Sequence, residues 1–292
     1  MKKESTKFLR NNISLIIAIV LLLIGIAVCF YPSISNYIAK KNQTEVIQDY
    51  IENITSKDDF SQEWEKAKTY NENLAGNPVH DPFVAGSGYA IPTNYSEVLD
   101  INGIMGYIEI PKISVNLPIY HGTSEEVLSK GVGHIEATSV PIGGKGTHCV
   151  LTGHTGLPSA ELFTRLDELK IGDYFYINVL DEVLTYKVNQ ILTVLPTELD
   201  SLQLEEDKDL VTLITCTPYG INTHRLLVRA ERTDYIPPDK VIENLQQSKE
   251  KKDLINYTFI GIVIGIGLLA IILIIIFIMT RKKHKGKRYY EK

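Results

Sequence analysis

Cys216 has the most reactive setting of any cysteine in this sequence. It ends an apolar run, 210–215, and is followed at once by the turn-forming segment Thr217-Pro218-Tyr219-Gly220. Such a run predicts a strand, and a side chain at a strand end points into the loops, where reactive groups are held on a rigid frame. We therefore predict a nucleophilic thiol at this position.

Arg225 opens the next predicted strand, nine residues after Cys216. If the loop 217–224 joins two antiparallel neighbours symmetrically, residue 216 pairs with residue 225, and paired residues point to the same face. A guanidinium beside a thiol favours the thiolate and offers paired donors to a carbonyl oxygen. A structural ion pair is the other interpretation of this arginine, and the spacing does not choose between them.

A cysteine nucleophile needs a base or an imidazolium partner. The best-placed histidine is His154, which follows Leu151-Thr152-Gly153 at another predicted strand end, between glycines that let the backbone turn sharply. His224 adjoins Arg225, but strand alternation would send it to the opposite face. The remaining candidates in the middle of the chain are His80, His121, His134 and His148.

The other two cysteines are interpreted as structural. Cys29 lies inside an apolar stretch near the N-terminus, and Cys149 lies in the middle of a predicted strand, where a buried free thiol is the usual state. Three cysteines are too few for a disulfide scaffold. The odd count is explained if one thiol is in a membrane, one in a core and one at a reaction centre.

Two apolar stretches are long enough to cross a membrane. They run over 13–30 and 257–279, and the second contains 23 residues without a charge. About 20 residues of helix span the hydrocarbon core of a bilayer. A cleaved secretory signal is the alternative for the first stretch, but the run is longer than such signals require. The following Tyr31-Pro32-Ser33 also lacks a small-residue cleavage site. We expect an uncleaved anchor.

The charge distribution predicts the topology. The 292 residues carry a net charge of −5, yet the segment before the first stretch carries +3 and the one after the second carries +6, which leaves −14 on residues 11–280. Positive flanks stay in the cytoplasm, so we expect two spans, both termini inside and residues 32–256 outside the cell. The acidic middle argues against a nucleic-acid partner.

The part of the chain expected outside the cell is predicted to form helices followed by short strands. Apolar residues recur at helical spacing in 41–74, and turn residues fill the loop that follows. The predicted divisions are a cytoplasmic N-terminus (1–12), a membrane anchor (13–31), a helical segment (32–75), a loop (76–92), a β domain (93–240), a juxtamembrane linker (241–256), a membrane helix (257–280) and a basic cytoplasmic tail (281–292).

The β domain contains eight candidate strands and two brief helical patterns, at 124–130 and 160–169. Many short strands with few helices favour a mainly β sandwich or closed barrel over a parallel sheet. The candidate strands are 104–110, 113–120, 147–152, 173–179, 183–189, 190–195, 210–216 and 225–232.

Three motifs resemble those of the sortases, the membrane-anchored cysteine transpeptidases of Gram-positive bacteria. Thr212-Leu213-Ile214-Thr215-Cys216 looks like their TLxTC signature, and the continuation 217–229 resembles the class C, or pilin-polymerising, branch. Leu151-Thr152-Gly153-His154, followed by Gly156-Leu157-Pro158, is similar to the family's histidine motif. Class C members also carry a second, C-terminal anchor.

The resemblance implies an eight-stranded closed β-barrel with N-terminal helices, flanked by two transmembrane helices. It implies that Cys216 is the nucleophile, His154 the general acid and base, and Arg225 the group that holds the substrate carbonyl or its oxyanion. The implied reaction cleaves an LPxTG-like sorting signal between Thr and Gly through a thioacyl enzyme, which a pilin lysine then resolves. No metal and no cofactor are expected.

Asp81-Pro82-Phe83 resembles the lid of class C sortases, in which an acid and an aromatic ring cover the active site. Phe83 departs mildly from the tryptophan often found there. An ordinary surface turn is the alternative interpretation, because a short motif of this kind arises easily by chance.

Three other functions remain open at this stage. The chain could be a housekeeping sortase that anchors proteins to cell-wall peptide, although the second anchor, the helical segment and the lid-like loop favour class C. A membrane-anchored cysteine peptidase would use water as the final acceptor. A non-catalytic binding ectodomain would tolerate loss of Cys216.

Overall fold

The structure is a computed structural model that describes residues 2–74, 94–198 and 200–238 together with Gly267, with side chains from residue 17 onward. The predicted lid loop, the linker 241–256, the second membrane stretch apart from Gly267, and the basic tail lie outside the described residues. Residues 1–236 form one unit and residues 237–292 another. The first of these units contains every element described below.

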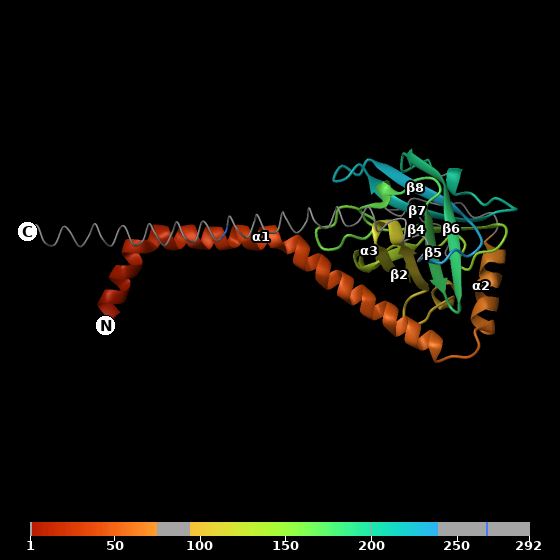
Figure 1. Cartoon of the computed structure of the whole chain (residues 1–292), viewed down its shortest axis with the longest axis horizontal. Helices are drawn as coiled ribbons and strands as arrows, with labels where there is room; N and C mark the ends of the chain where they lie inside the picture. The colour runs from red at the N-terminus through yellow and green to blue at the C-terminus, as the bar shows by residue number, and fades with distance from the viewer. Residues whose placement is uncertain (1, 75–93, 199, 239–266, 268–292) are drawn as a thin grey trace, which may run out of the picture. The chain divides into compact units, whose positions relative to one another are not determined.

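Eight strands close into a barrel in the order β1-β2-β3-β4-β7-β8-β6-β5, and β5 pairs with β1 to complete the ring (Figure 1). This confirms the predicted mainly β, eight-stranded closed barrel. The strands are β1 (Gly106–Ile110), β2 (Val115–His121), β3 (Val132–His134), β4 (Thr147–Thr152), β5 (Tyr174–Val179), β6 (Glu182–Val194), β7 (Asp209–Thr217) and β8 (His224–Arg232).

Two features of the barrel differ from the prediction. β6 runs unbroken through the two strands expected at 183–189 and 190–195, with an irregular register between Val188 and Gln190. β3 was not predicted, because three residues are too few to show an alternating pattern. β3 nevertheless closes the ring by pairing in parallel with β2 and antiparallel with β4.

The helical pattern at 160–169 was also a wrong prediction. That segment consists of turns and one short 3-10 helix, η3 (Leu166–Glu168), and its apolar residues Leu162, Phe163 and Leu166 are buried in the core. The helical spacing of these apolar residues therefore indicated burial in the core and not a helix. The pattern at 124–130 is confirmed as α3 (Glu125–Lys130), which begins where the Ser124 side chain accepts a hydrogen bond from the backbone of Val127.

Two helices precede the barrel. α1 (Lys2–Thr55) is continuous from the predicted anchor into the predicted helical segment, with Pro32 inside it, and α2 (Ser61–Asn73) completes that segment. α1 is long and apolar enough to cross a membrane, and none of its most apolar window is buried by protein. This supports membrane anchoring through the N-terminal stretch.

Hydrogen bonds hold both helices on the barrel. On α1, Tyr50 accepts a bond from the backbone of Leu180 at 2.7 Å, across 130 residues of sequence. On α2, Asn71 accepts a bond from the Val140 backbone N–H at 2.8 Å and donates one to the Val140 carbonyl at 3.4 Å. Figure 1 shows α1 and α2 on the flank of the barrel that carries β2, β5 and the start of β6.

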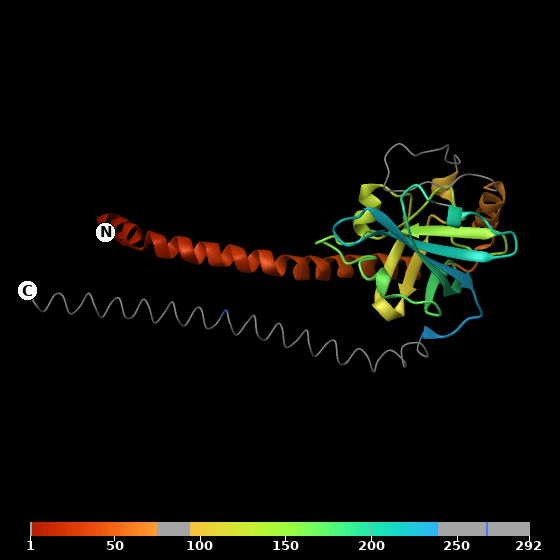
Figure 2. The same cartoon turned by 90° about the horizontal axis from the view of Figure 1, so that it is seen from above.

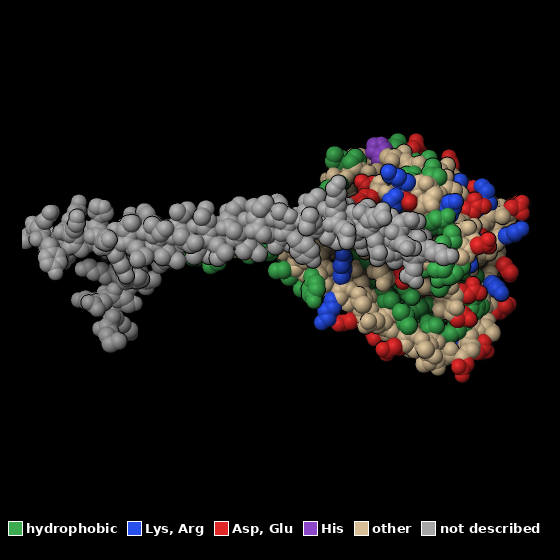
Figure 3. All heavy atoms as spheres, viewed as in Figure 1, with side chains coloured by type: hydrophobic (Ala, Val, Ile, Leu, Met, Phe, Trp, Pro, Cys, Tyr) green, Lys and Arg blue, Asp and Glu red, His purple; other side chains and the backbone are tan. Residues whose placement is uncertain are grey.

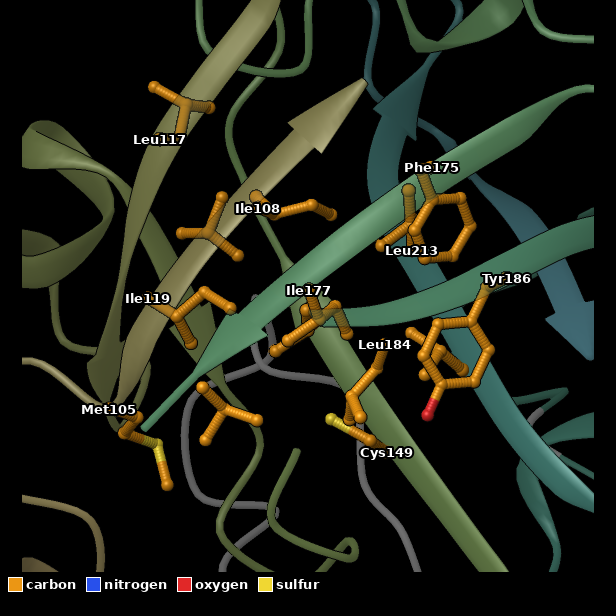
Figure 4. Packing of buried hydrophobic residues seen from close by; sticks show 14 of the residues in the cluster. Met105, Ile108, Leu117, Ile119, Cys149, Phe175, Ile177, Leu184, Tyr186 and Leu213 are labelled. Carbon is orange, nitrogen blue, oxygen red and sulfur yellow. The ribbon is translucent and has the colours of Figure 1, made fainter. Parts of the chain in front are cut away.

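The inside of the barrel is filled by side chains. Met105, Ile108, Ile177, Phe175 and Leu213 are fully buried, and Figure 4 shows side chains of β1, β5 and β7 gathered in the same interior. An eight-stranded barrel has an interior just wide enough for side chains to fill. The centre of this barrel is therefore a core, and any site must lie on its outer face or at its rim.

A buried polar cluster sits between α2 and the core. The Tyr95 hydroxyl lies 2.9 Å from Nδ1 of His134, whose Nε2 lies 2.9 Å from the Ser139 carbonyl. The Tyr95 ring stacks on His134 and contacts the rings of His121 and Tyr70. Because His134 is fully buried, desolvation lowers its pKa to about 3.

This cluster predicts acid sensitivity. Unfolded histidine titrates near 6.5, so between pH 6.5 and 3 the unfolded chain binds a proton that folded His134 excludes. The free energy of unfolding should fall by about 1.4 kcal/mol per pH unit in that window from this residue. His134→Gln should flatten the decrease, measured by urea unfolding of the detergent-solubilised chain at several pH values. Equal slopes for the two proteins would contradict the assignment.

Candidate active site

Cys216 and Arg225 are direct partners on neighbouring strands. β7 and β8 pair antiparallel, and the register joins residue 216 to residue 225 and residue 217 to residue 224. This confirms the pairing predicted from loop symmetry. Cys216 is half-buried at the end of β7, and Arg225 is buried at the start of β8. The thiol and the guanidinium therefore stem from adjacent positions on one face of the sheet.

His154 reaches the other side of Cys216 from β4. β4 and β7 run parallel, with Thr152 beside Ile214, and the Gly153 backbone N–H donates to the Ile214 carbonyl at 3.1 Å. The Thr215 hydroxyl donates to the Gly153 carbonyl at 2.7 Å. β4 ends at Thr152, and Gly153 is the last residue after it that these bonds tie to β7. His154 follows Gly153 as Cys216 follows Thr215, so both lie one residue beyond this contact.

The three predicted residues thus form a row across the ends of β4, β7 and β8. The row lies on the outer face of the barrel, because Val211, Leu213 and Val228 point into the core and the alternating set points outward. Ile214 and Leu227, which face the same way as Cys216 and Arg225, belong to a second buried apolar cluster. Its members are Ile135, Val150, Leu202, Ile214 and Leu227, with Leu192 and Val194 against them.

The backbone of the β7–β8 loop orients the Arg225 guanidinium. Its Nη1 donates to the carbonyls of Asn222 and His224, each at 3.2 Å. A guanidinium has five N–H donors in a fixed fork, so two bonds on one nitrogen fix its plane. Arg225 can then aim donors at an oxygen atom bound next to Cys216, which is the oxyanion-stabilising arrangement.

Glu125 is a member of the site that sequence reasoning missed. Its Oε2 lies 3.5 Å from Nε2 of His154, an ion pair whenever the imidazole is protonated. Glu125 is 29 residues away in sequence, in the first turn of α3, and no local pattern links it to the histidine motif. Only the parallel pairing of β2 with β3, which α3 connects, brings that turn to the ends of the strands.

The structure separates the other histidines from the thiol. His134 belongs to the buried Tyr95 cluster, and His121 bonds to the Val98 carbonyl at 2.7 Å. His148 is buried between the Gln203 carbonyl and the Thr212 hydroxyl, and burial lowers its pKa. His224 contacts Thr223, and His80 lies outside the described residues.

The remaining cysteines have the structural settings that were predicted. Cys149 points into the barrel core, and burial raises the pKa of its thiol well above the usual value (Figure 4). Cys29 is exposed on the apolar part of α1. In the described part of the chain, no group of three or more histidine, cysteine or acidic side chains could hold a metal ion.

Comparison with known proteins agrees with the barrel. Residues 108–233 match the family model of the sortase domain. Sortase A of Bacillus anthracis is 30% identical over 224 residues, which cover 76% of this chain and 95% of that protein. The region that matches the family model contains all eight strands except the start of β1.

Two solved structures are more similar still. Streptococcus pneumoniae sortase C is 43% identical, with a TM-score of 0.61 over 66% of this chain and 99% of that one. Actinomyces oris sortase C-1 is 50% identical, with a TM-score of 0.58 over 60% of this chain and 98% of that one. The fold and the matches define a cysteine transpeptidase. The chain belongs to the sortase family, and these neighbours assign it to class C.

The Thr215–Gly153 hydrogen bond predicts a positioning effect. Thr215→Val leaves a buried carbonyl without its donor and loosens the turn that carries His154, at a cost of about 1–2 kcal/mol. We expect kcat for cleavage of a fluorogenic sorting peptide to fall about tenfold, with KM nearly unchanged. Thr215→Ser should restore kcat, because it keeps the hydroxyl. Equal losses in the valine and serine variants would contradict this role.

Proposed function

We propose that this class C sortase cleaves an LPxTG-like sorting signal between Thr and Gly and joins the threonine to a pilin lysine, so that it assembles covalent pili. The observation that carries the proposal is the row of His154, Cys216 and Arg225 across three strand ends. The S. pneumoniae neighbour, whose pilin substrate specificity is described with its structure, supports a pilin substrate.

In the first step the Cys216 thiolate attacks the carbonyl carbon of the substrate threonine. Negative charge moves to the carbonyl oxygen, where Arg225 donates hydrogen bonds; a preorganised donor of this kind contributes about 3–4 kcal/mol. The C–N bond to glycine then breaks, and the His154 imidazolium gives its proton to the departing amine. The products are a thioester on Cys216 and a free N-terminal glycine peptide.

In the second step a lysine amine of the next pilin attacks the thioester. Neutral His154 takes a proton from the amine, the C–S bond breaks, and an isopeptide bond and the Cys216 thiolate result. Each cycle returns both residues to their starting protonation states. Water competes with the amine for the thioester, so a sheltered groove favours transpeptidation.

The segment 76–92 is proposed as a lid over this groove. Asp81 would pair with the active-site cation or thiol, and Phe83 would shield Cys216. Tyr70 of α2 and Tyr95, which flank this segment in sequence, have ring centroids 5.8 Å apart. The described residues before and after the segment therefore lie close together, which supports the lid proposal. The enzyme is further proposed to be a two-pass membrane protein with its catalytic domain outside the cell and both termini in the cytoplasm.

The function is tested by trapping. The full chain is incubated with an LPxTG-type peptide, with and without a lysine-containing pilin peptide, and the products are mapped by mass spectrometry. We expect a thioacyl adduct on Cys216 and an isopeptide product when the amine is present, and neither from Cys216→Ala. Hydrolysis alone would indicate a peptidase. If the enzyme accepts a cell-wall peptide in preference to the pilin peptide, it is a housekeeping sortase. An adduct on Cys149 would overturn the assignment of the active site.

The lid predicts a change in resting reactivity. Phe83→Ala should raise the rate at which iodoacetamide alkylates Cys216 in the absence of substrate, because the thiol loses its cover. Tyr235→Ala, which removes an exposed aromatic ring beyond the end of β8, is the matched control and should leave the rate unchanged. An alkylation rate unchanged by Phe83→Ala would contradict the lid.

A further inference from the structure

Two large apolar side chains stand in solvent just beyond Cys216. Tyr219 and Ile221, in the β7–β8 loop, are 68% and 67% exposed. Figure 3 shows hydrophobic side chains on the end of the barrel where this hairpin projects. The two side chains are close in sequence, so they form a small apolar surface three to five residues after Cys216.

This loop is in contact with the loop that carries His154. A Cβ atom added to Gly156 would lie 3.1 Å from Cε2 of Tyr219, so the tyrosine ring lies directly over the Gly156 backbone. Gly156 also has a φ of +75°, a region that favours glycine. Figures 1 and 2 show both loops leaving the barrel at the same end.

The loop that carries His154 is in turn bound to α1 close to the end of the membrane stretch. The Ser35 hydroxyl donates to the Ser159 carbonyl at 3.2 Å, and Lys40 pairs with Glu161 at 3.1 Å. The apolar run of α1 ends at Phe30. Ser35 therefore lies about 7.5 Å further along the helix, at 1.5 Å of rise per residue.

That distance compares directly with the thickness of a bilayer interface. The polar layer on each side of the hydrocarbon core is about 5–8 Å thick, so Ser35 and the loop bound to it lie at its outer edge. α1 presents exposed Tyr31 within this layer, and tyrosine is enriched at membrane interfaces. The loop that carries His154 is therefore held close to the level at which α1 leaves the bilayer.

We infer that the β7–β8 loop docks on the bilayer that α1 spans, with Tyr219 and Ile221 in its interfacial layer. The inference rests on the proposed membrane anchoring and is independent of transpeptidation. It places Cys216, which lies three residues before Tyr219, at the membrane surface, within reach of a substrate anchored in the same bilayer. The occupant of the apolar surface is therefore lipid.

The test measures depth in the membrane. The full chain, with Cys29→Ser and Cys216→Ser and with buried Cys149 retained, is labelled at Ile221→Cys with an environment-sensitive fluorophore. It is then reconstituted in bilayers of phosphatidylcholine and phosphatidylglycerol. Quencher-bearing lipids should reduce its fluorescence roughly twofold or more, as expected for an interfacial side chain. Tyr219→Cys, labelled in the same way, provides a second site in the loop.

The matched control is Val183→Cys, another exposed aliphatic position. Val183 is 41% exposed and follows Leu180, which bonds to Tyr50, 15 residues beyond Ser35 on α1. Its label should be quenched much less than those at residues 219 and 221. If neither loop label is quenched more than the Val183 label, the docking surface is disproved, whatever the outcome of the peptide reaction.

Discussion

The parallel pairing of β4 with β7 is the constraint on which the site depends. The β7–β8 hairpin brings Cys216 beside Arg225 at little cost, because only eight residues separate them. His154 lies 62 residues before Cys216 in sequence. Only the register that pairs Thr152 with Ile214 brings it to this end of β7. The Thr215 hydroxyl then closes this pairing at the point where β4 ends. A slip by one residue would turn His154 to the opposite face.

Much of the barrel and of the site could be predicted because the signals were local. Alternation and turn residues revealed most strands, and loop symmetry revealed the Cys216–Arg225 pair. The features that were not predicted depend on contacts between residues that are distant in sequence. β3 is defined by its neighbours and not by its own three residues, the segment 160–169 is apolar because the core needs Phe163, and Glu125 meets His154 only through the path of β2, α3 and β3.

The packed interior explains why the chemistry lies outside the barrel. With Cys149 and its neighbours filling the centre, a thiol there is desolvated and its pKa rises, so it cannot act as a nucleophile. Cys216 lies outside that environment for two reasons. Strand alternation turns its side chain to the outer face, and it lies near the end of β7. The two thiols of the adjacent strands β4 and β7 therefore have opposite settings, since Cys149 is buried in the core and Cys216 is half-buried on the outer face.

A single helix links this chemistry to the membrane. Because α1 continues from the apolar stretch to Thr55 and bonds to the barrel at Ser35 and Tyr50, the height of Cys216 above the bilayer is set by helix geometry and not by a flexible linker. Pro32 removes one backbone donor near the end of the apolar stretch, which lets the helix bend there without losing continuity. A rigid link of this kind keeps the barrel at a fixed height, and a fixed height raises the effective concentration of any group anchored in the same bilayer.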